Sequence, residues 1–165
     1  MGPFAGLIEG QAIEEYQLKA AVLYNLAKFV EWPSSTFRNP ADPIVSCVLG
    51  DSPFGRSLDR ELNGKSIEDR KFVVRHVEET RQAGGCRILV VTGFDRKRWR
   101  SVLNEIEVRG LLTVGEIEGF ASEGGVANLK LESGKVRVQI NVQAGDRAGL
   151  RISSRLLSLA QIVKK

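Results

Sequence analysis

The chain has 165 residues, of which 42% are hydrophobic and 27% charged, and its formal net charge is +4 at pH 7. This length and composition suit one domain with a substantial core and argue against two domains. Acidic residues interrupt the basic ones throughout, whereas a nucleic-acid surface concentrates its positive charge, so we expect no nucleic-acid partner. No apolar run approaches the roughly 20 residues that a membrane-spanning helix needs.

Residues 1–12 lack the charged start and apolar centre of a secretion signal. We interpret them as an N-terminal tail, which is either a cloning remnant in front of an exported chain or the native start of a cytoplasmic one. The folded domain is then expected to span residues 13–165.

Residues 15–33 are predicted to form one helix that Pro33 ends, because proline also disfavours helical geometry at the preceding Trp32. Apolar residues recur at helical spacing in two neighbouring stripes, so the apolar arc is wide. The stripes are Leu18, Val22, Leu26 and Phe29, and Tyr16, Ala20, Leu23, Ala27 and Val30. A helix of this kind is expected to be sandwiched between other elements.

Short apolar runs then alternate with helical segments. Strands are predicted at 44–49, 72–77, 88–91 and 111–114, and helices at 53–62 and 95–107, the second with Asp95 as its N-cap. The run at 44–49 is nearly all apolar, as expected for a central parallel strand covered on both faces.

The pattern changes near the C-terminus. The segments 126–131 and 136–142 flank a polar turn with Gly134, which predicts an antiparallel hairpin, and residues 154–163 are predicted to form a closing helix. The fold class is therefore α/β: a single-domain sandwich with a mostly parallel central sheet, an antiparallel hairpin at one edge and helices on both faces.

The segment Gly50–Ser57 has the outline of a phosphate-binding loop between a strand and a helix. Pro53 removes one backbone N–H from such a cradle, Asp51 adds negative charge, and Arg56 replaces the compact lysine. A strand-to-helix turn is the better interpretation, and a nucleotide-binding enzyme stays the weakest alternative. Asp51 also lies where a response-regulator receiver keeps its phospho-accepting residue, but the further acids that such a site requires are missing.

Cys47 lies inside the strand predicted at 44–49, and Cys86 just precedes the one at 88–91. They are too far apart for a CxxC motif, and His76 is the only histidine, so a zinc site is poorly supplied. A structural disulfide stays open, since the first and third strands of a doubly wound sheet are commonly neighbours. If Gly50 and Gly93 mark equivalent strand ends, the cysteines are offset by roughly 13 Å, and bridging requires a bend before Cys86.

The remaining polar candidates favour structural roles. His76 has no nucleophile in a recognisable setting and is interpreted as a strand-surface residue. Glu116 and Glu118 are interpreted as solubilising loop residues. The basic cluster at 96–100 around Trp99 is interpreted as a solvated helix face. We expect no catalytic residue, cofactor or metal.

Several blocks of the sequence occur in an order and spacing that resembles the YfiR family of exported bacterial proteins, from about residue 14 to residue 163. They are Tyr24–Pro33, Cys47–Gly55, Cys86–Val90, Leu112–Gly115, Gly119–Ala121, Gly124–Gly125, Val136–Asn141 and Gly149–Leu157. No single block is diagnostic, and the specificity lies in their succession along the chain.

The resemblance implies a periplasmic α/β protein that acts by binding and is not an enzyme. The best-known member represses an inner-membrane diguanylate cyclase through its periplasmic domain, which lowers cyclic di-GMP. An outer-membrane lipoprotein relieves that repression, and the member forms dimers. The resemblance also implies a disulfide between Cys47 and Cys86, as suits an oxidising compartment. A second cysteine pair of that member, near Gly124, has no counterpart here.

The candidate partner-contacting residues are aromatic side chains beyond the regular elements, namely Trp32, Phe37, Phe54 and Phe120. A homodimer is expected through the same surface. An alternative function is a small-molecule-sensing periplasmic domain that partners a sensor histidine kinase. That function requires a pocket at the strand ends near Gly50, Gly93 and Gly115.

Overall fold

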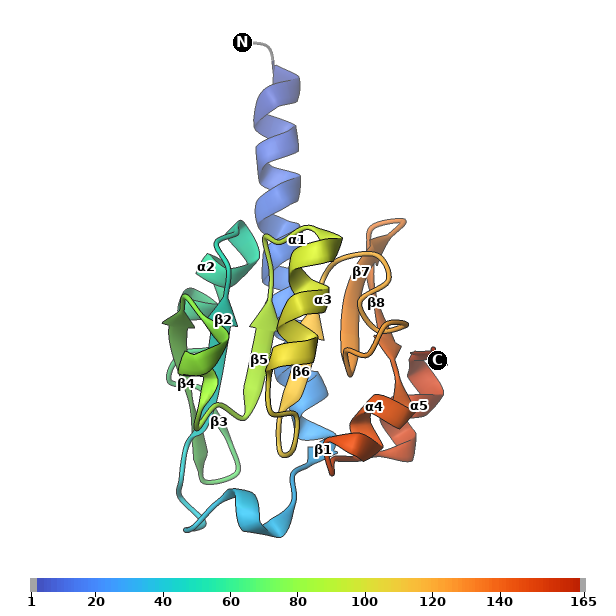
Figure 1. The fold of residues 1–165 in the computed structure, drawn as a ribbon. Helices are drawn as coiled ribbons and strands as arrows, with labels where there is room; N and C mark the ends of the chain where they lie inside the picture. Colours follow the sequence, from blue (N-terminus) through green and yellow to red (C-terminus); the bar gives the residue numbers. More distant parts are fainter. Residues whose placement is uncertain (1–2, 164–165) are drawn as a thin grey trace.

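The central feature of the fold is an eight-stranded mixed sheet with the strand order β10-β8-β7-β6-β5-β2-β4-β3 (Figure 1). The computed structural model describes residues 3–163, with side chains from residue 14 onward. The strands of this sheet are β2 (Ile44–Leu49), β3 (Ser66–Ile67), β4 (Arg70–Val77), β5 (Ile88–Val91), β6 (Leu112–Gly115), β7 (Ala127–Glu132), β8 (Lys135–Ile140) and β10 (Gln161–Ile162). The five neighbours β4, β2, β5, β6 and β7 run parallel, so the sheet is mostly parallel, as predicted.

Helices cover both faces of the sheet, as the alternating pattern predicts. The helices are α1 (Pro3–Lys28), α2 (Pro53–Glu61), α3 (Arg96–Glu105), α4 (Val142–Arg147) and α5 (Ser154–Leu159), with short 3-10 turns η1 (Ser34–Thr36) and η2 (Thr80–Ala83). Residues of α1 and α2 pack into one apolar core with one face of the sheet. Trp99 and Val102 of α3 pack into a second core on the other face.

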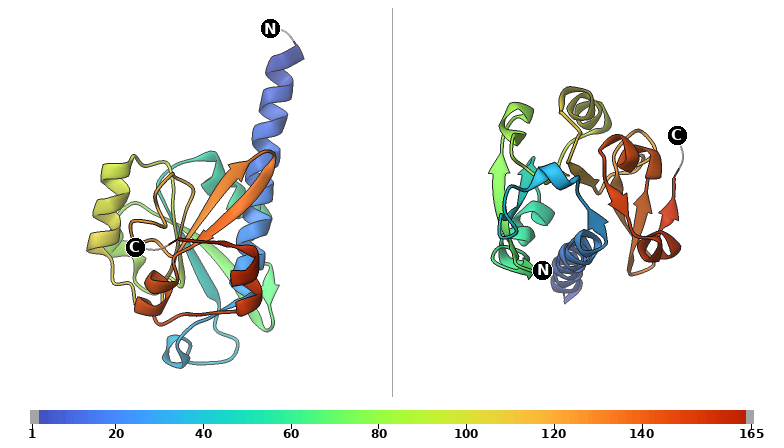
Figure 2. Two further views of the ribbon diagram at one scale, coloured as in Figure 1. Left: turned by 90° about the vertical axis from the view of Figure 1, so that its right-hand side faces the viewer. Right: turned by 90° about the horizontal axis from the view of Figure 1, so that it is seen from below.

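Helix α1 differs from the prediction in length and in burial. It begins at Pro3 and ends at Lys28, and its N-terminal half extends beyond the sheet (Figures 1 and 2). Ala20 and Leu23 of one stripe and Leu26 of the other are buried, whereas Leu18 is 40% exposed. The helix is therefore not sandwiched: it covers one face of the sheet, and its outer side is open to solvent.

Beyond Lys28 the chain enters a short strand that the sequence analysis assigned to the helix. This strand, β1 (Val30–Glu31), pairs antiparallel with β9 (Arg151–Ile152) in a separate two-stranded sheet. Strands of two residues are too short to show a period, so neither was predicted. The short strand β10 lies where the end of a longer helix was expected, and the helix α4 follows the predicted hairpin in a stretch for which no element was predicted.

The predicted hairpin is present, with the two-residue turn Ser133–Gly134 between β7 and β8. Both turn residues have positive φ, at 51° and 77°, which is the conformation that matches the right-handed twist of paired strands. The hairpin is followed at the sheet edge by β10, which pairs parallel with β8.

A disulfide joins Cys47 in β2 to Cys86, with 5.8 Å between the Cα atoms. In the ladder Cys47 lies opposite Leu89, so a straight strand would place Cys86 about three residues, or roughly 10 Å, away. The chain instead bends at Arg87, between Cys86 and β5, after a turn in which Gly85 has φ 82° and the Cys86 amide donates to the Ala83 carbonyl at 3.1 Å. The bend that allows the bridge thus follows Cys86, whereas the sequence argument expected it before Cys86.

Helix α3 begins at the predicted cap, because the Asp95 carboxylate accepts the amide of Arg98 at 2.9 Å. The first turn carries Arg96, Lys97 and Arg98, whose charges oppose the positive end of the helix dipole.

We expect Asp95→Ala to lower the free energy of unfolding by about 1 kcal/mol. Asp95→Asn keeps the capping acceptor and should cost less. Urea unfolding of the three proteins measures both effects, and an equal loss in both variants would contradict a capping role.

Candidate functional site

Two of the four predicted partner-contacting aromatics lie inside the protein. Phe54 and Phe120 are both 0% exposed. The Phe120 ring lies so close to two glycines that a Cβ at Gly115 or at Gly125 would meet it at 2.5 and 2.1 Å. These two side chains are core residues and present no surface to a partner, which corrects their place among the contact candidates.

The other two, Trp32 and Phe37, are half-buried and contact each other edge-to-face, with ring centroids 6.2 Å apart. They lie beyond β1, at the end of the sheet where β2 begins, and line a cleft of about 650 Å³. The Trp32 indole is fixed by a 3.0 Å hydrogen bond from its Nε1 to the Arg87 carbonyl. We call this the aromatic cleft; Val30, Ile44, Ile67 and Arg70 also line it.

The loop between β1 and β2 that carries Phe37 is held by cations and by an internal cap. The guanidinium of Arg70 lies 3.7 Å from the centroid of the Phe37 ring and donates to the Asn39 and Asp42 carbonyls at 2.9 Å. The Asp42 carboxylate accepts the amides of Asn39 and Arg38, and these bonds lower its pKa. The aromatic cleft is therefore a preformed surface.

The rim of the aromatic cleft is charged, and its cations outnumber its anions. Lys28, Arg70 and Arg151 face Glu31 and Glu68 around it. Arg151 and Glu31 approach to 3.9 Å, but both side chains are more than three-quarters exposed, and such a pair contributes little to stability.

The segment Gly50–Ser57 forms the strand-to-helix turn that we favoured over a phosphate cradle. The Ser52 hydroxyl caps α2 by accepting the Gly55 amide, and Pro53 occupies the first helical position. Arg56, which stands where a phosphate-binding loop has lysine, pairs with Asp51 at 2.6 Å. The Gly55 amide and the Arg56 guanidinium, which a bound phosphate would need as donors, are therefore already engaged within the protein.

The point at which the loops after β2 and β5 meet, beside which a small-molecule pocket was expected, is filled by protein atoms. Gly50 has φ 104°, and a Cβ there would lie 1.7 Å from the Thr92 carbonyl oxygen. A Cβ at Gly93 would lie 2.4 Å from the Asp51 carbonyl oxygen. The loops after β2 and β5 thus cross in direct contact between Gly50 and Gly93. A cleft lies beside this crossing and is lined by Leu49 and Phe94, the chain neighbours of those two glycines.

A polar network that the sequence analysis missed lies next to this crossing. The Lys19 ammonium, with 5% of its side chain exposed, pairs with Glu116 at 2.8 Å and with Glu15 at 2.7 Å. Glu116 also accepts the Thr92 hydroxyl, which contacts the Ser52 hydroxyl at 2.6 Å. Glu116 is therefore a structural ion-pair partner and not a solubilising loop residue. Ninety-seven positions separate it from Lys19, so no local pattern could join them.

The ionisation of Lys19 reflects two opposed effects. Burial alone would lower the pKa of the ammonium group, but the hydrogen bonds and charges of Glu116 and Glu15 outweigh it. The pKa of Lys19 is consequently raised above its ordinary value of 10.5, and the group stays charged inside the protein.

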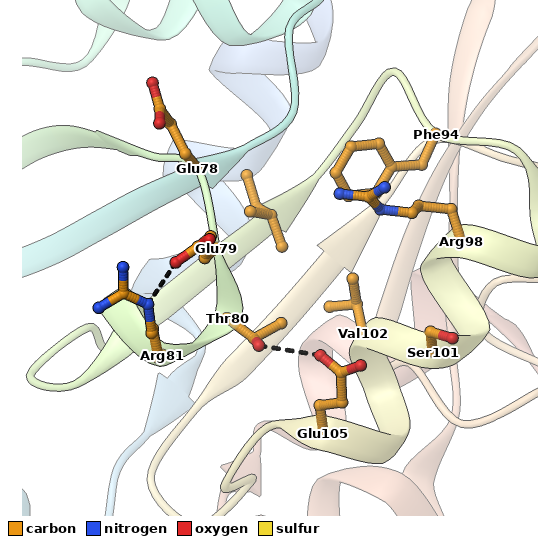
Figure 3. A pocket seen from close by; sticks show the side chains of 10 residues that line it. Glu78, Glu79, Thr80, Arg81, Phe94, Arg98, Ser101, Val102 and Glu105 are labelled. Atoms are coloured by element: carbon orange, nitrogen blue, oxygen red, sulfur yellow. Dashed lines mark hydrogen bonds and ion pairs between the residues drawn. The ribbon is translucent and has the colours of Figure 1, made fainter.

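A second cleft, of about 450 Å³, lies between the chain after β4 and helix α3 (Figure 3). Its polar side chains are largely occupied by one another. Thr80 donates to Glu105 at 3.0 Å, Glu79 pairs with Arg81, and Arg98 lies over the Phe94 ring at 4.9 Å. The aromatic cleft, which is larger and is lined by two of the predicted contact residues, is the stronger candidate for binding.

The other predicted polar sites have structural surroundings. His76 lies on the strand surface and contacts Asp59 at 2.6 Å, and Glu118 pairs with Lys130 at 3.0 Å. The basic residues around buried Trp99 are exposed, as predicted. Across the part of the chain that the structure describes, no three His, Cys, Asp or Glu side chains gather as metal ligands. No helix among those residues is long and apolar enough to span a membrane.

Comparison with known proteins places this architecture in a family. No curated protein matches the chain. The sequence profile of the YfiR/HmsC-like family matches residues 16–161, which include every strand from β1 to β9 and both cysteines. The chain thus belongs to the YfiR/HmsC-like family.

Proposed function

We propose that this protein is a periplasmic repressor of a membrane-bound diguanylate cyclase and that it binds the periplasmic domain of that enzyme through the aromatic cleft. Membership of the YfiR/HmsC-like family supports a periplasmic regulator of a diguanylate cyclase. The finer claim rests on one observation: Trp32 and Phe37 are the predicted contact residues that line an open cleft.

The physical properties of the aromatic cleft suit protein recognition. Aromatic side chains that are half-buried and held in place lose little conformational freedom on binding. Trp32 is fixed by its bond to Arg87, and Phe37 by the stacked Arg70. The protein is proposed to act by binding alone, without turnover.

Repression then follows from a shift in populations. A sensor domain with an active and an inactive arrangement is held inactive by a protein that binds the inactive one better. Moving the equilibrium from 1:99 to 99:1 requires a differential affinity of about 5.5 kcal/mol. A second copy of the chain and an outer-membrane lipoprotein, both implied by the family resemblance, are proposed as further partners that compete for or complete this surface.

Delivery of the protein to the periplasm of its source bacterium should lower cellular cyclic di-GMP, measured by mass spectrometry of nucleotide extracts. We expect Phe37→Ala to abolish most of this decrease, because it removes a ring from the aromatic cleft. Leu159→Ala is the matched control, since Leu159 is 81% exposed and does not line the cleft.

Circular dichroism and the amount of exported protein must be equal for the three proteins. An unchanged cyclic di-GMP level after delivery of the parent protein would refute repression. Equal repression by the parent and by Phe37→Ala would refute the cleft as the contact surface.

A further inference from the structure

We infer that the aromatic cleft takes its partner as an extended, acidic peptide segment, which adds a strand to the open edge of β1. The inference deepens the proposed function and depends on it only for the identity of the partner protein. Two observations carry it: the backbone of β1 has an unpaired side, and the rim of the cleft carries excess positive charge.

The unpaired side of β1 follows from its hydrogen-bond pattern with β9. The Ser153 amide donates to the Phe29 carbonyl at 2.9 Å, and Glu31 lies opposite Arg151. Bonded positions alternate along an antiparallel pair, so Phe29 and Glu31 face β9 while Val30 and Trp32 turn their amide and carbonyl groups away. Within residues 3–163, no strand pairs with β1 on that side.

This free edge borders the aromatic cleft. Val30 and Trp32 line the cleft on one side, and Ile67 and Glu68 at the end of β3 line it on another. Seen from below, β1 lies between the β3–β4 segment, drawn in green, and the C-terminal segment, drawn in red (Figure 2). A segment in the cleft would therefore lie beside the backbone groups of Val30 and Trp32 that β9 leaves unpaired. Open strand edges are the template for binding by strand addition.

The lining of the cleft determines which side chains such a segment should carry. Successive side chains of an extended strand point to opposite sides. One set would face the apolar wall of Trp32, Phe37 and Ile44, and the intervening set would face the charged rim. The expected sequence thus alternates apolar residues with residues that suit the rim.

The charges at the rim favour acidic residues at those intervening positions. Among the described side chains, neither Lys28 nor Arg70 is in a salt bridge: Lys28 lies over the Tyr24 ring at 4.5 Å, and Arg70 donates to two carbonyls and has the Asp42 carboxylate as its acidic neighbour. Arg151 has only the 3.9 Å approach to Glu31. Carboxylates on the partner would give these cations charge-assisted hydrogen bonds.

Selection of a phage-displayed library of random dodecapeptides on the immobilised protein tests the inference without knowledge of the partner. We expect enrichment of sequences that alternate apolar residues with aspartate or glutamate. The most enriched peptide is then synthesised with N-methyl groups at odd positions or at even positions. Strand addition predicts that only one set raises the Kd, by about tenfold, because only alternate amides face β1.

Charge variants give a second readout. Arg151→Glu combined with Lys28→Glu should raise the Kd of the enriched peptide about tenfold. Arg155→Glu is the matched control and should leave the Kd unchanged, since Arg155 is exposed on the neighbouring helix and does not line the cleft. Enrichment of basic peptides, absence of enrichment, or equal effects of both N-methyl sets would overturn the inference.

These results are distinguishable from failure of the proposed function. If alternate N-methylation weakens the peptide but delivery of the parent protein leaves cyclic di-GMP unchanged, the binding mode is supported and the proposed function fails. If Phe37→Ala abolishes repression while the library yields no strand-adding peptide, the proposed function is supported and the inference fails.

Discussion

Replacing both Cys47 and Cys86 by alanine is expected to lower the free energy of unfolding by about 4 kcal/mol. The bond closes a loop of 39 residues. In the loop-closure description, removing the bond raises the chain entropy of the unfolded state, and this increase accounts for the expected loss of stability. Neither cysteine is more than 4% exposed, and the bond ties the segment after η2 to the sheet face. Equilibrium urea unfolding measured by tryptophan fluorescence gives the difference.

Reductant provides the matched test of the same bond. Unfolding of the parent protein in dithiothreitol should give the free energy of the double variant, and dithiothreitol should leave the double variant unchanged. Thiol titration of the unfolded parent confirms that the bond is open. A parent protein that keeps its full stability with two titratable thiols would show that the bond contributes nothing.

Lys19→Met is expected to lower the free energy of unfolding by roughly 3–5 kcal/mol, because it leaves Glu116 as a largely buried carboxylate without its cation. Of the hydrogen-bond donors to its side chain in the described part of the structure, Glu116 would keep only the Thr92 hydroxyl. Combining Lys19→Met with Glu116→Gln removes the stranded charge and should restore part of the loss. Lys130→Met breaks an exposed pair with Glu118 and serves as the control, with little change expected.

The contribution of Lys19 should depend on pH in one direction. Its pKa is raised in the folded protein, so the stabilisation is complete below the unfolded-state value near 10.4 and disappears as the pH rises through the folded-state pKa. The difference between the parent and Lys19→Met should thus be constant from pH 7 to 9 and should shrink above pH 11. A difference that persists unchanged at high pH would assign the effect to packing and not to charge.

The four predicted contact residues show why one sequence criterion can select both core residues and surface residues. Trp32, Phe37, Phe54 and Phe120 all lie outside or at the ends of regular elements in the sequence pattern. Burial of Phe54 and Phe120 depends on partners far away in the chain or on close approach to glycines, such as Gly125 against Phe120. Aromatic character indicates burial or binding equally well, and only the packed neighbours separate the two.

The sequence by itself determined the elements with strong local signals: the nearly all-apolar strand at 44–49, the strand at 88–91, the Asp95 cap and the hairpin turn at Gly134. Each is specified by residues within a few positions of one another. Tertiary structure alone decided which apolar residues of α1 are buried, the pairing of Lys19 with Glu116, and the open edge of β1. The physical reason is that these features join segments distant in the chain, and a hydrophobic period shows that a face is apolar without showing what covers it.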